Sequence, residues 1–347
     1  MRIAVIAPLR FPIREPFRGG LEMFTDLLVR ALMERGHEVL LLAHPDSSPD
    51  LPLVPVPFPE RAGFGGTLRA HARMLRILAK LDVDVIHDNS IHFLPPLWSR
   101  KTGRPMVTTL HTPPYRASRL TGWMTRGRHP HRFVSISDHL GRQWAPYVGA
   151  YTVVHNGIDL QSWPAELSAP ARPLAVCYGR ITPEKGIHHA IRAAKVAGFP
   201  LSIAGAVADR DYFEQLIAPE VGEDVRYLGH LNRAQLGELL AGASVGVFPA
   251  VWDEPFGLVL VEMLACGTPV AAFNSGATPE ILTSEVGVVV EKGDAEALAS
   301  AIGEAAGKDR ADCRRRAEQF SIQKMVEAYE AVYRSVLAVN DVVDQGL

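Results

Sequence analysis

The chain has 347 residues, of which 47% are hydrophobic and 21% charged, and this length suits two domains that each have a core. Three cysteines (Cys177, Cys266 and Cys313) lie far apart, which excludes a CxxC redox or metal motif and favours a reduced compartment. The sequence has neither the apolar run of a signal peptide nor the roughly 18 apolar residues of a membrane span, so we expect a cytoplasmic protein, free or bound at a membrane surface.

Short apolar segments alternate with helical ones through the first half of the chain. Residues 3–7 form an apolar run that ends at Pro8, which predicts a buried strand, and residues 21–35 have helical periodicity up to Gly36. Further strands are expected at 39–43, 83–87, 106–110, 133–136 and 151–154. The proline-rich stretch 52–59 is unsuited to a central strand, so we expect extended chain at the surface or at a sheet edge. The alternation predicts a parallel sheet covered by helices.

A second alternating set follows a linker rich in Pro, Ala and Ser at 164–173. Strands are expected at 174–178, 201–204, 225–228, 245–248 and 269–272, with helices that include 186–197, 233–241 and 257–265. A long amphipathic helix is expected from 321 to 339. We therefore predict an α/β protein with two Rossmann-like doubly wound domains facing a central cleft, 1–160 and 172–320, and a C-terminal segment, 321–347, that packs back on the first domain. In such sheets ligands bind at the carboxyl ends of the strands.

Two cations follow directly on the first strand of the second domain. Arg180 and Lys185 lie in Gly179-Arg180-Ile181-Thr182-Pro183-Glu184-Lys185-Gly186, between that strand and a helix. Cations and helix N-termini stabilise a departing diphosphate, which a metal ion would otherwise have to do. No DxD motif lies in a suitable loop, since Asp82-Val83-Asp84 opens a strand. A solvated turn is the alternative interpretation.

Two glutamates eight residues apart frame the start of a helix. Glu254 precedes the loop of Phe256 and Gly257, and Glu262 lies in the following helix. The amides of Gly257, Leu258 and Val259 form a helix N-terminus suited to a phosphate. One carboxylate is placed to hold sugar hydroxyls and the other a ribose.

These motifs resemble those of family-4 retaining glycosyltransferases with the GT-B fold, over nearly the whole chain. Glu254 and Glu262 match the E-x7-E motif, and Arg180 and Lys185 match the diphosphate-binding pair. The sequence is also similar to the family at a glycine loop (Gly19-Gly20-Leu21-Glu22), a hinge signature (Asn156-Gly157-Ile158-Asp159), an active-site histidine (His111) and a serine before the hinge (Ser135 or Ser137). Trp252-Asp253 before Glu254 departs from the usual pattern.

Several of these positions have a structural alternative. Gly19 and Gly20 let a backbone approach a phosphate, or simply begin a helix. Ser137 binds the donor or caps a helix. Leu228 and Leu231, after another strand, are candidates to frame the nucleotide base. His111 gains weight from its place at the carboxyl end of a strand.

The resemblance implies that the protein transfers a hexose-type sugar from a UDP- or GDP-sugar with retention of configuration. Glu254 then holds sugar hydroxyls, Glu262 the ribose, and His111 the sugar or its departing charge. The nucleotide sugar is a substrate, and neither a metal nor another cofactor is expected. The alternatives are a nucleotide-sugar 2-epimerase, which changes the donor without an acceptor, and a non-catalytic sugar-nucleotide-binding protein.

The first half of the chain is basic and the second acidic. Residues 1–165 hold 20 basic and 13 acidic residues, a balance of +7, and the remainder has a balance of −9. No acidic residue lies between Asp88 and Asp138, where there are eight basic ones: Arg100, Lys101, Arg104, Arg116, Arg119, Arg126, Arg128 and Arg132. Four more, Arg69, Arg73, Arg76 and Lys80, share one expected helix face. This charge predicts an anionic or lipid-linked acceptor, or peripheral contact with an anionic membrane, unless the face is merely solvated; aromatic residues are not interleaved as nucleic acid would require.

Overall fold

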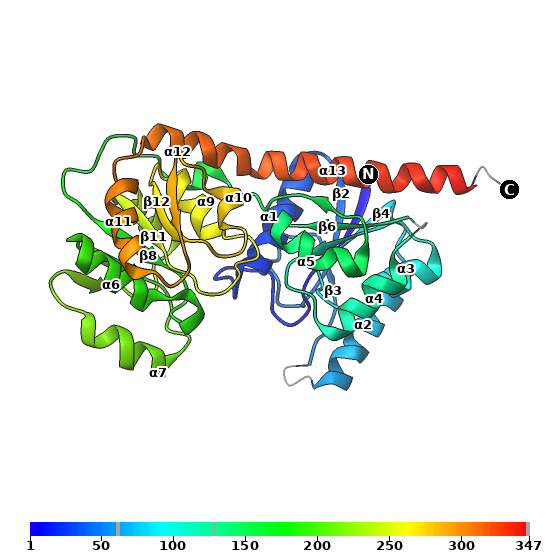
Figure 1. Cartoon of the computed structure of the whole chain (residues 1–347). Helices are drawn as coiled ribbons and strands as arrows, with labels where there is room; N and C mark the ends of the chain where they lie inside the picture. The colour runs from blue at the N-terminus through cyan, green and yellow to red at the C-terminus, as the bar shows by residue number, and fades with distance from the viewer. Residues whose placement is uncertain (60–62, 128–129, 345–347) are drawn as a thin grey trace. The chain divides into compact units, whose positions relative to one another are not determined.

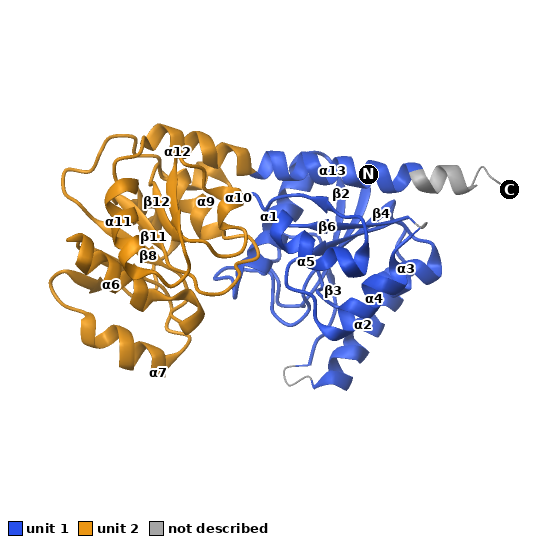
Figure 2. Cartoon of the chain, in the orientation of Figure 1, with its two compact units in different colours: residues 1–157, 322–347 blue, residues 158–321 orange. Residues whose placement is uncertain are grey.

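The computed structural model describes residues 1–59, 63–127 and 130–344 and divides into two compact units (Figures 1 and 2). Unit 1 comprises Met1–Gly157 and Ile322–Leu347, and unit 2 comprises Ile158–Ser321. Arg128 of the basic stretch lies outside the described residues. The described helices include none that is long and apolar enough to cross a membrane.

Unit 1 is built on a parallel sheet in the order β3-β2-β1-β4-β5-β6-β7. Its strands are β1 (Arg2–Ile6), β2 (Glu38–Ala43), β3 (Leu53–Pro55), β4 (Val85–Asp88), β5 (Met106–Leu110), β6 (His131–Ser135) and β7 (Thr152–Val153). The proline-rich stretch supplies β3 at the sheet edge, as the sequence predicted.

Both faces of this sheet are buried because alternate side chains of each strand point to opposite sides. Ile3 and Val5 of β1 lie in one hydrophobic cluster, and Ala4 and Ile6 lie in another. The helices of unit 1 are α1 (Gly20–Glu34), α2 (Phe64–Leu78), α3 (Leu94–Thr102), α4 (Arg116–Thr125), α5 (Asp138–Val148) and α13 (Ile322–Asp344). The first cluster takes its helical residues from α1 and α13, and the second from α2.

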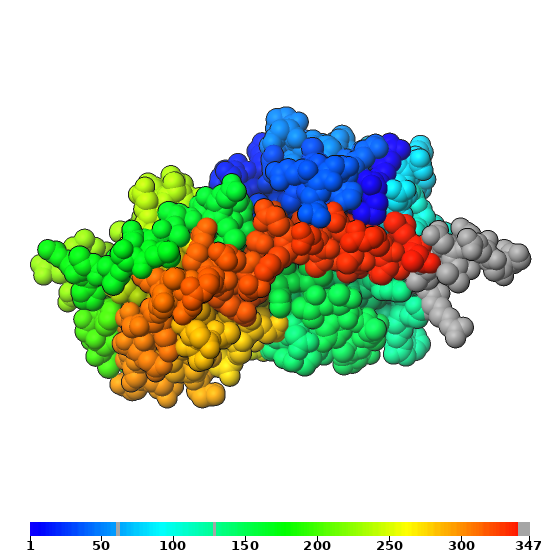
Figure 3. All heavy atoms as spheres, turned by 90° about the horizontal axis from the view of Figure 1, so that it is seen from above, coloured from blue at the N-terminus to red at the C-terminus, as the bar shows by residue number. Residues whose placement is uncertain are grey.

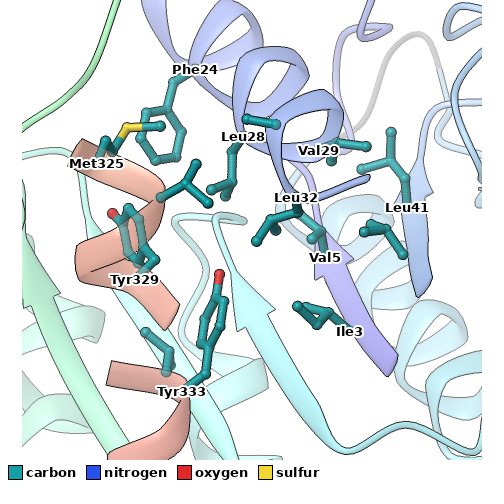
Figure 4. Packing of buried hydrophobic residues seen from close by; sticks show 14 of the residues in the cluster. Ile3, Val5, Phe24, Leu28, Val29, Leu32, Leu41, Met325, Tyr329 and Tyr333 are labelled. Carbon is teal, nitrogen blue, oxygen red and sulfur yellow. The ribbon is translucent and has the colours of Figure 1, made fainter. Parts of the chain in front are cut away.

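Helix α13 belongs to the core of unit 1 although unit 2 separates it from the rest of that unit in sequence. Met325, Tyr329 and Tyr333 pack against Phe24 and Leu28 of α1 and the apolar residues of β1 (Figure 4). Figure 3 shows its outer surface (red) with the N-terminal residues (blue) beside it. Buried polar groups align the helix, because the hydroxyl of Tyr333 lies 2.5 Å from Nδ1 of His87 in β4.

Unit 2 repeats the same architecture in the order β10-β9-β8-β11-β12-β13, again all parallel. Its strands are β8 (Ala175–Tyr178), β9 (Leu201–Ala204), β10 (Val225–Tyr227), β11 (Val245–Phe248), β12 (Val270–Phe273) and β13 (Gly287–Val290). Its α-helices are α6 (Ile187–Ala197), α7 (Arg210–Tyr212), α8 (Arg233–Ala241), α9 (Leu258–Ala265), α10 (Thr278–Ile281), α11 (Ala295–Ala305) and α12 (Arg310–Ala317). Short helical turns complete it: η1 (Leu160–Ser162), η2 (Pro183–Lys185), η3 (Phe213–Ile217), η4 (Ala218–Glu220) and η5 (Glu318–Phe320).

The predicted α/β class with two doubly wound parallel sheets is confirmed. The sequence interpretation did not predict β13, a four-residue edge strand that is half-buried over most of its length. A short apolar run at an edge carries little periodic signal, and its pairing with β12 defines it.

Candidate active site

The strand orders mark one point in each sheet where ligands are expected. Chain connections leave in opposite directions from β1 and β4 in unit 1 and from β8 and β11 in unit 2, so a crevice opens outside the carboxyl ends of each pair. The loops after β8 and β11 contain Arg180, Lys185 and Glu254, and those after β1 and β4 contain Gly19 and Asn89.

Glu254 is held by two donors. Nζ of Lys185 lies 2.6 Å from Oε2 of Glu254, and Nε1 of Trp252 donates to the same oxygen at 2.9 Å. The ammonium also lies 5.3 Å from the centroid of the Trp252 ring. Both charged side chains are largely buried, with 15% of Lys185 and 14% of Glu254 exposed. The structure thus brings together the cation and the first glutamate that the sequence assigned to one site.

Close backbone approaches fix this arrangement. Gly186, after Lys185, has φ 66°, and a Cβ there would lie 2.1 Å from the carbonyl oxygen of Pro249. Gly276 has φ 59°, and a Cβ there would lie 2.1 Å from the carbonyl oxygen of Glu254. That carbonyl also accepts from the amide of Ala277 at 2.9 Å. Glycine is needed at both positions because a side chain would separate the loops.

Helix α9 begins directly after this loop. Gly257 is its N-cap, with φ 100° and no side-chain capping bond, and Leu258 and Val259 are the first two helical residues. Phe256 is buried, with its ring 5.9 Å from that of Phe320. The apolar anchor and the glycine turn position the amides of the first turn, which carry the partial positive charge of a helix N-terminus.

Glu262 lies apart from the Lys185–Glu254 pair in its interactions. Its carboxylate accepts a hydrogen bond from the hydroxyl of Tyr178, at the end of β8. Burial raises the pKa of Glu262, and the Tyr178 hydroxyl partly offsets this effect. Burial and the neighbouring carboxylate raise the pKa of Tyr178 well above 10. In this structure, therefore, the Glu262 carboxylate that was expected to bind the ribose is hydrogen-bonded to Tyr178 instead.

The other predicted donor residues of unit 2 are more exposed. The side chain of Arg180 is 61% exposed, and its guanidinium lies 3.9 Å from Glu184. Leu228 is exposed and Leu231 is half-buried, both in the loop after β10. The hydroxyl of Tyr227 donates to the carbonyl of Gly205 at 2.7 Å and thereby ties the β10 end to the β9 loop.

In unit 1, His111 lies just past β5 and is buried. Its Nε2 is 2.9 Å from Oδ1 of Asn89, and its ring packs edge-on against Phe24 at 4.8 Å between centroids. Burial, together with nearby His87, lowers the pKa of His111 to about 3, so the ring is neutral near pH 7. Because a carbonyl oxygen only accepts, Nε2 carries the hydrogen and Nδ1 keeps its lone pair. His111 is therefore arranged to accept a hydrogen bond through Nδ1.

A pocket opens beside His111 within unit 1. Its walls come from β4, β5 and β6, the loop before α3, the inner face of α4, and α5; they include Asp88, Thr108, His111, Ser118, Thr121 and Trp144. Burial raises the pKa of Asp88 to about 6, against hydrogen bonds from Ser90 and Thr108 that lower it. The pocket thus combines a mostly apolar wall with one carboxyl group that protonates under mildly acidic conditions.

The remaining predicted positions of unit 1 lie at helix starts. Gly19 is the N-cap of α1 and Gly20 its first residue, both exposed. The buried side chain of Glu22 reaches back to Gly19, and burial raises the pKa of Glu22. Ser137 is the N-cap of α5, where its hydroxyl accepts from the amide of Leu140 at 3.1 Å. The capping role that the sequence left open for Ser137 is therefore present.

The basic residues of unit 1 divide into two kinds. Arg104 is structural, because its guanidinium donates to the carbonyls of Leu78 and Leu81, both at 2.9 Å, after α2. By contrast, Arg69, Arg73, Arg76 and Lys80 are exposed. The face of α2 that they follow is opposite its buried residues.

Three neighbours of the site were not proposed from the sequence. Asn89 orients His111, Tyr178 binds Glu262, and Trp252 binds Glu254. Asn89 and Tyr178 each stand at the carboxyl end of a strand that flanks a crevice, which is the signal that could have identified them.

Known proteins resemble this chain in sequence and fold. Two family models match consecutive parts: Glycosyltransferase Family 4 matches residues 18–162, and Glycosyl transferases group 1 matches residues 162–320. The chain is 30% identical over 333 residues to a phosphatidyl-myo-inositol mannosyltransferase of Mycobacterium leprae, covering 87% of this chain and 86% of that protein. It is 31% identical over 262 residues to a glycogen synthase of Mycobacterium tuberculosis, where the match spans 66% of this chain but only 63% of the relative. An Anabaena protein crystallised with UDP-glucose has a similar fold, with a TM-score of 0.75, 18% identity, and coverage of 96% and 100% of the two chains.

Proposed function

The chain belongs to glycosyltransferase family 4 and has the GT-B fold, and we propose that it transfers a hexose-type sugar from a nucleotide-diphosphate sugar to an anionic or lipid-linked acceptor. The donor nucleotide is UDP or GDP, with UDP favoured by the Anabaena structure that holds UDP-glucose. The reaction retains the configuration of the anomeric carbon.

The observation that carries this proposal is the contact of Lys185 with Glu254 at the carboxyl ends of β8 and β11. It places a cation, a carboxylate and the start of α9 in one crevice. Lys185, with Arg180 and the amides at Gly257, stabilises the negative charge that grows on the diphosphate as it leaves. Glu254 holds hydroxyls of the sugar. Since both are paired in this structure, donor binding exchanges part of their contact for contacts to the substrate.

Further residues would hold the remaining parts of the donor. Glu262 binds the ribose hydroxyls in exchange for, or together with, the Tyr178 hydroxyl. Leu228 and Leu231 frame the base, and Gly19, Gly20 and Ser137 are the further candidates to contact the donor. His111 accepts a sugar hydroxyl through Nδ1.

In a retaining transfer the acceptor oxygen bonds to the anomeric carbon on the face from which the phosphate oxygen departs. The sugar–phosphate bond breaks, the acceptor–sugar bond forms, and the acceptor proton passes to the leaving phosphate. The protein therefore acts mainly by orienting both substrates and stabilising charge.

Nucleotide binding is the direct test. A thermal-shift series with UDP, GDP and ADP is expected to show concentration-dependent stabilisation by one of them, which grows as the logarithm of ligand concentration above Kd. Incubation with the matching sugar nucleotide then yields nucleotide diphosphate and a product with retained configuration. Stabilisation by no nucleotide diphosphate would contradict the proposal, and a new sugar epimer formed without acceptor would identify an epimerase.

We further propose that catalysis needs no metal ion, since Lys185 and Arg180 supply positive charge at the diphosphate. Turnover is expected to persist in excess EDTA. Loss of activity in EDTA that Mg²⁺ or Mn²⁺ restores would overturn this part of the proposal.

A further inference from the structure

Helix α4 of unit 1 buries its small and polar side chains and exposes its large apolar ones. The residues that it buries are small or polar: Ser118, Thr121, Gly122 and Thr125. Its outer face carries Arg116, Arg119, Leu120, Trp123 and Met124, at the i, i+3, i+4, i+7 and i+8 spacing of one helical stripe. Leu120 is 60% exposed and Trp123 is 55% exposed. A water-facing helix normally has the opposite arrangement, so this face is suited to another environment.

The surface continues beyond the helix itself. Tyr115, its N-cap, is exposed, and its hydroxyl donates to the carbonyl of Ile91 at 2.9 Å. Ile91 is also exposed and adopts the left-handed region, with φ 49°, which is strained for a β-branched residue. Four of the exposed large hydrophobic side chains of the described chain therefore fall within residues 115–124, with Ile91 beside them.

The side chains around this surface carry positive charge, which favours an anionic partner. Arginines 116, 119 and 126 accompany the apolar residues, and the guanidinium of Arg126 lies 5.5 Å from the centroid of the Trp123 ring. The sequence from Asn89 to Ser137 contains no carboxylate that would repel an anion. A single tryptophan that lies among apolar side chains, with arginines beside it, is suited to a lipid interface, where the ring lies at headgroup level and the cation pairs with phosphate.

We propose that α4, with Tyr115 and Ile91, lies in the headgroup layer of an anionic bilayer. On α2 the exposed basic residues Arg69, Arg73 and Arg76 are not interspersed with exposed large apolar side chains, and Phe64, at the first position of the helix, is its one strongly exposed large apolar residue. This face is therefore suited to attracting an anionic surface more than to inserting into it. The inner face of α4 forms one wall of the pocket that His111 lines, since Ser118, Thr121 and Gly122 border it. Resting on the proposed function, this placement gives a lipid-linked acceptor a short route from the bilayer surface to the sugar.

Vesicle binding tests the inference. The full chain is mixed at low salt with vesicles of equimolar phosphatidylcholine and phosphatidylglycerol, or of phosphatidylcholine alone, and sedimented. Binding is expected only to the anionic vesicles. Leu120→Ser with Trp123→Ser, and separately Arg116→Glu with Arg126→Glu, are expected to weaken the apparent partition by about tenfold or more. Brominated phosphatidylglycerol is expected to quench tryptophan emission in the wild type and to quench it less in Trp123→Phe.

Matched variants act as controls. Val196→Ser with Leu216→Ser removes two exposed apolar residues from unit 2 and is expected to bind like the wild type. Arg69→Glu with Arg73→Glu reverses two charges on α2 and is expected to weaken binding less than the α4 reversal.

The inference is overturned if the wild type does not bind anionic vesicles, or if the α2 reversal abolishes binding while both α4 variants bind normally. The inference is also overturned if the wild type does not bind vesicles but forms a dimer that Leu120→Ser with Trp123→Ser converts to a monomer. The α4 surface would then contact a second copy of the chain. Thermal shifts with UDP or GDP in every variant report on the donor site separately, so failure of the proposed function is distinguishable from failure of membrane binding.

Discussion

At the scale of single residues, the shared oxygen of Glu254 organises the site in unit 2. It accepts from an indole and an ammonium, and that ammonium also lies near the indole ring. Trp252, which departs from the usual family pattern, therefore contacts both charged groups of this pair.

Replacing this lysine tests its proposed catalytic role. Lys185→Ala is expected to lower kcat by roughly 10²–10³, the scale for removing one group that stabilises developing charge, and Arg180→Ala should act in the same direction. The control is Lys195→Ala, since Lys195 of α6 is about half exposed and pairs with Glu220 of η4. Steady-state kinetics on the three variants decides the point: near-normal turnover in Lys185→Ala would reject the assignment.

The hydrogen bond from His111 to Asn89 leads to a pH prediction. Asn89→Asp places a carboxylate next to Nε2, which raises the pKa of His111 from about 3 and favours the charged ring. The charged ring has no lone pair on Nδ1, so kcat of this variant is expected to fall as pH decreases, on a limb that the parent lacks. Asn89→Ala should lower kcat without adding that limb. Parallel pH profiles for the parent and Asn89→Asp would show that Asn89 has only a structural role.

The sequence predicted which residues end strands better than which side chains meet. Lys185 and Glu254 both follow apolar runs, so their place at one sheet edge could be expected from alternation alone. The partners of His111 and Glu262 depend on strand order and on side-chain direction, neither of which periodicity specifies. Arg104 shows a second kind of error. From the sequence it was counted as one of the surface charges of the basic half, but in the structure its guanidinium donates to backbone carbonyls at the end of α2.

At the scale of elements, α13 packs against the sheet of unit 1 through apolar contacts and through buried hydrogen bonds. Its apolar face was evident from spacing, but its polar contacts were not. Nε2 of His87 lies 2.8 Å from the hydroxyl of Thr109, which in turn lies 3.1 Å from that of Tyr329. The largely buried carboxylate of Glu330 pairs with the partly exposed Arg35 at 2.7 Å, and this contact lowers the pKa of Glu330 to about 2.

Removing one hydroxyl should measure the buried part of this network. Tyr333→Phe is expected to destabilise unit 1 by about 1–3 kcal/mol, because Nδ1 of buried His87 loses the partner that it has in the structure. Ser335→Ala changes the exposed side of the same helix and should cost less than about 0.5 kcal/mol. Urea unfolding near neutral pH compares them, and equal effects would refute a special role for the His87 contact.

At the scale of the whole molecule, buried histidines set the response to acid. Burial lowers the pKa values of His87, His92 and His111 to about 3, with nearby histidines adding to the effect for His92 and His111. Their neutral forms support the folded state fully above the unfolded pKa of about 6.5, and this support is lost as pH falls toward 3. Asp88 acts in the opposite direction, since its pKa is raised to about 6. His71, His188 and His189, whose pKa values burial also lowers, add to the effect of these histidines, whereas Glu22 and Glu262, whose pKa values burial raises, add to that of Asp88. Because the histidines are the larger set, we expect a net loss of stability between about pH 6.5 and 4.

A single replacement isolates one contribution. His92 stacks on His71 at 3.7 Å between ring centroids, and His92→Gln is expected to reduce the acid slope by up to about 1.4 kcal/mol per pH unit, the value for one proton. Replacement of exposed His230 by Gln is the matched surface control. The measurement is the free energy of unfolding from urea titrations at several pH values. An unchanged slope in His92→Gln would contradict the assignment.

The return of α13 to unit 1 also bears on how the protein is made. During translation, residues 1–157 leave the ribosome before unit 2, but the side chains of α13 that cover one face of their sheet follow only after all of unit 2. At about 5–20 residues per second this delay is on the order of ten to thirty seconds. Unit 2 is continuous in sequence, so it can fold during that interval. Over the same interval, the apolar residues of β1 and α1 that pack against α13 remain exposed to solvent. The core of unit 1 is thus completed after that of unit 2, although most of unit 1 is synthesised earlier, and its apolar surface stays exposed until α13 has been synthesised.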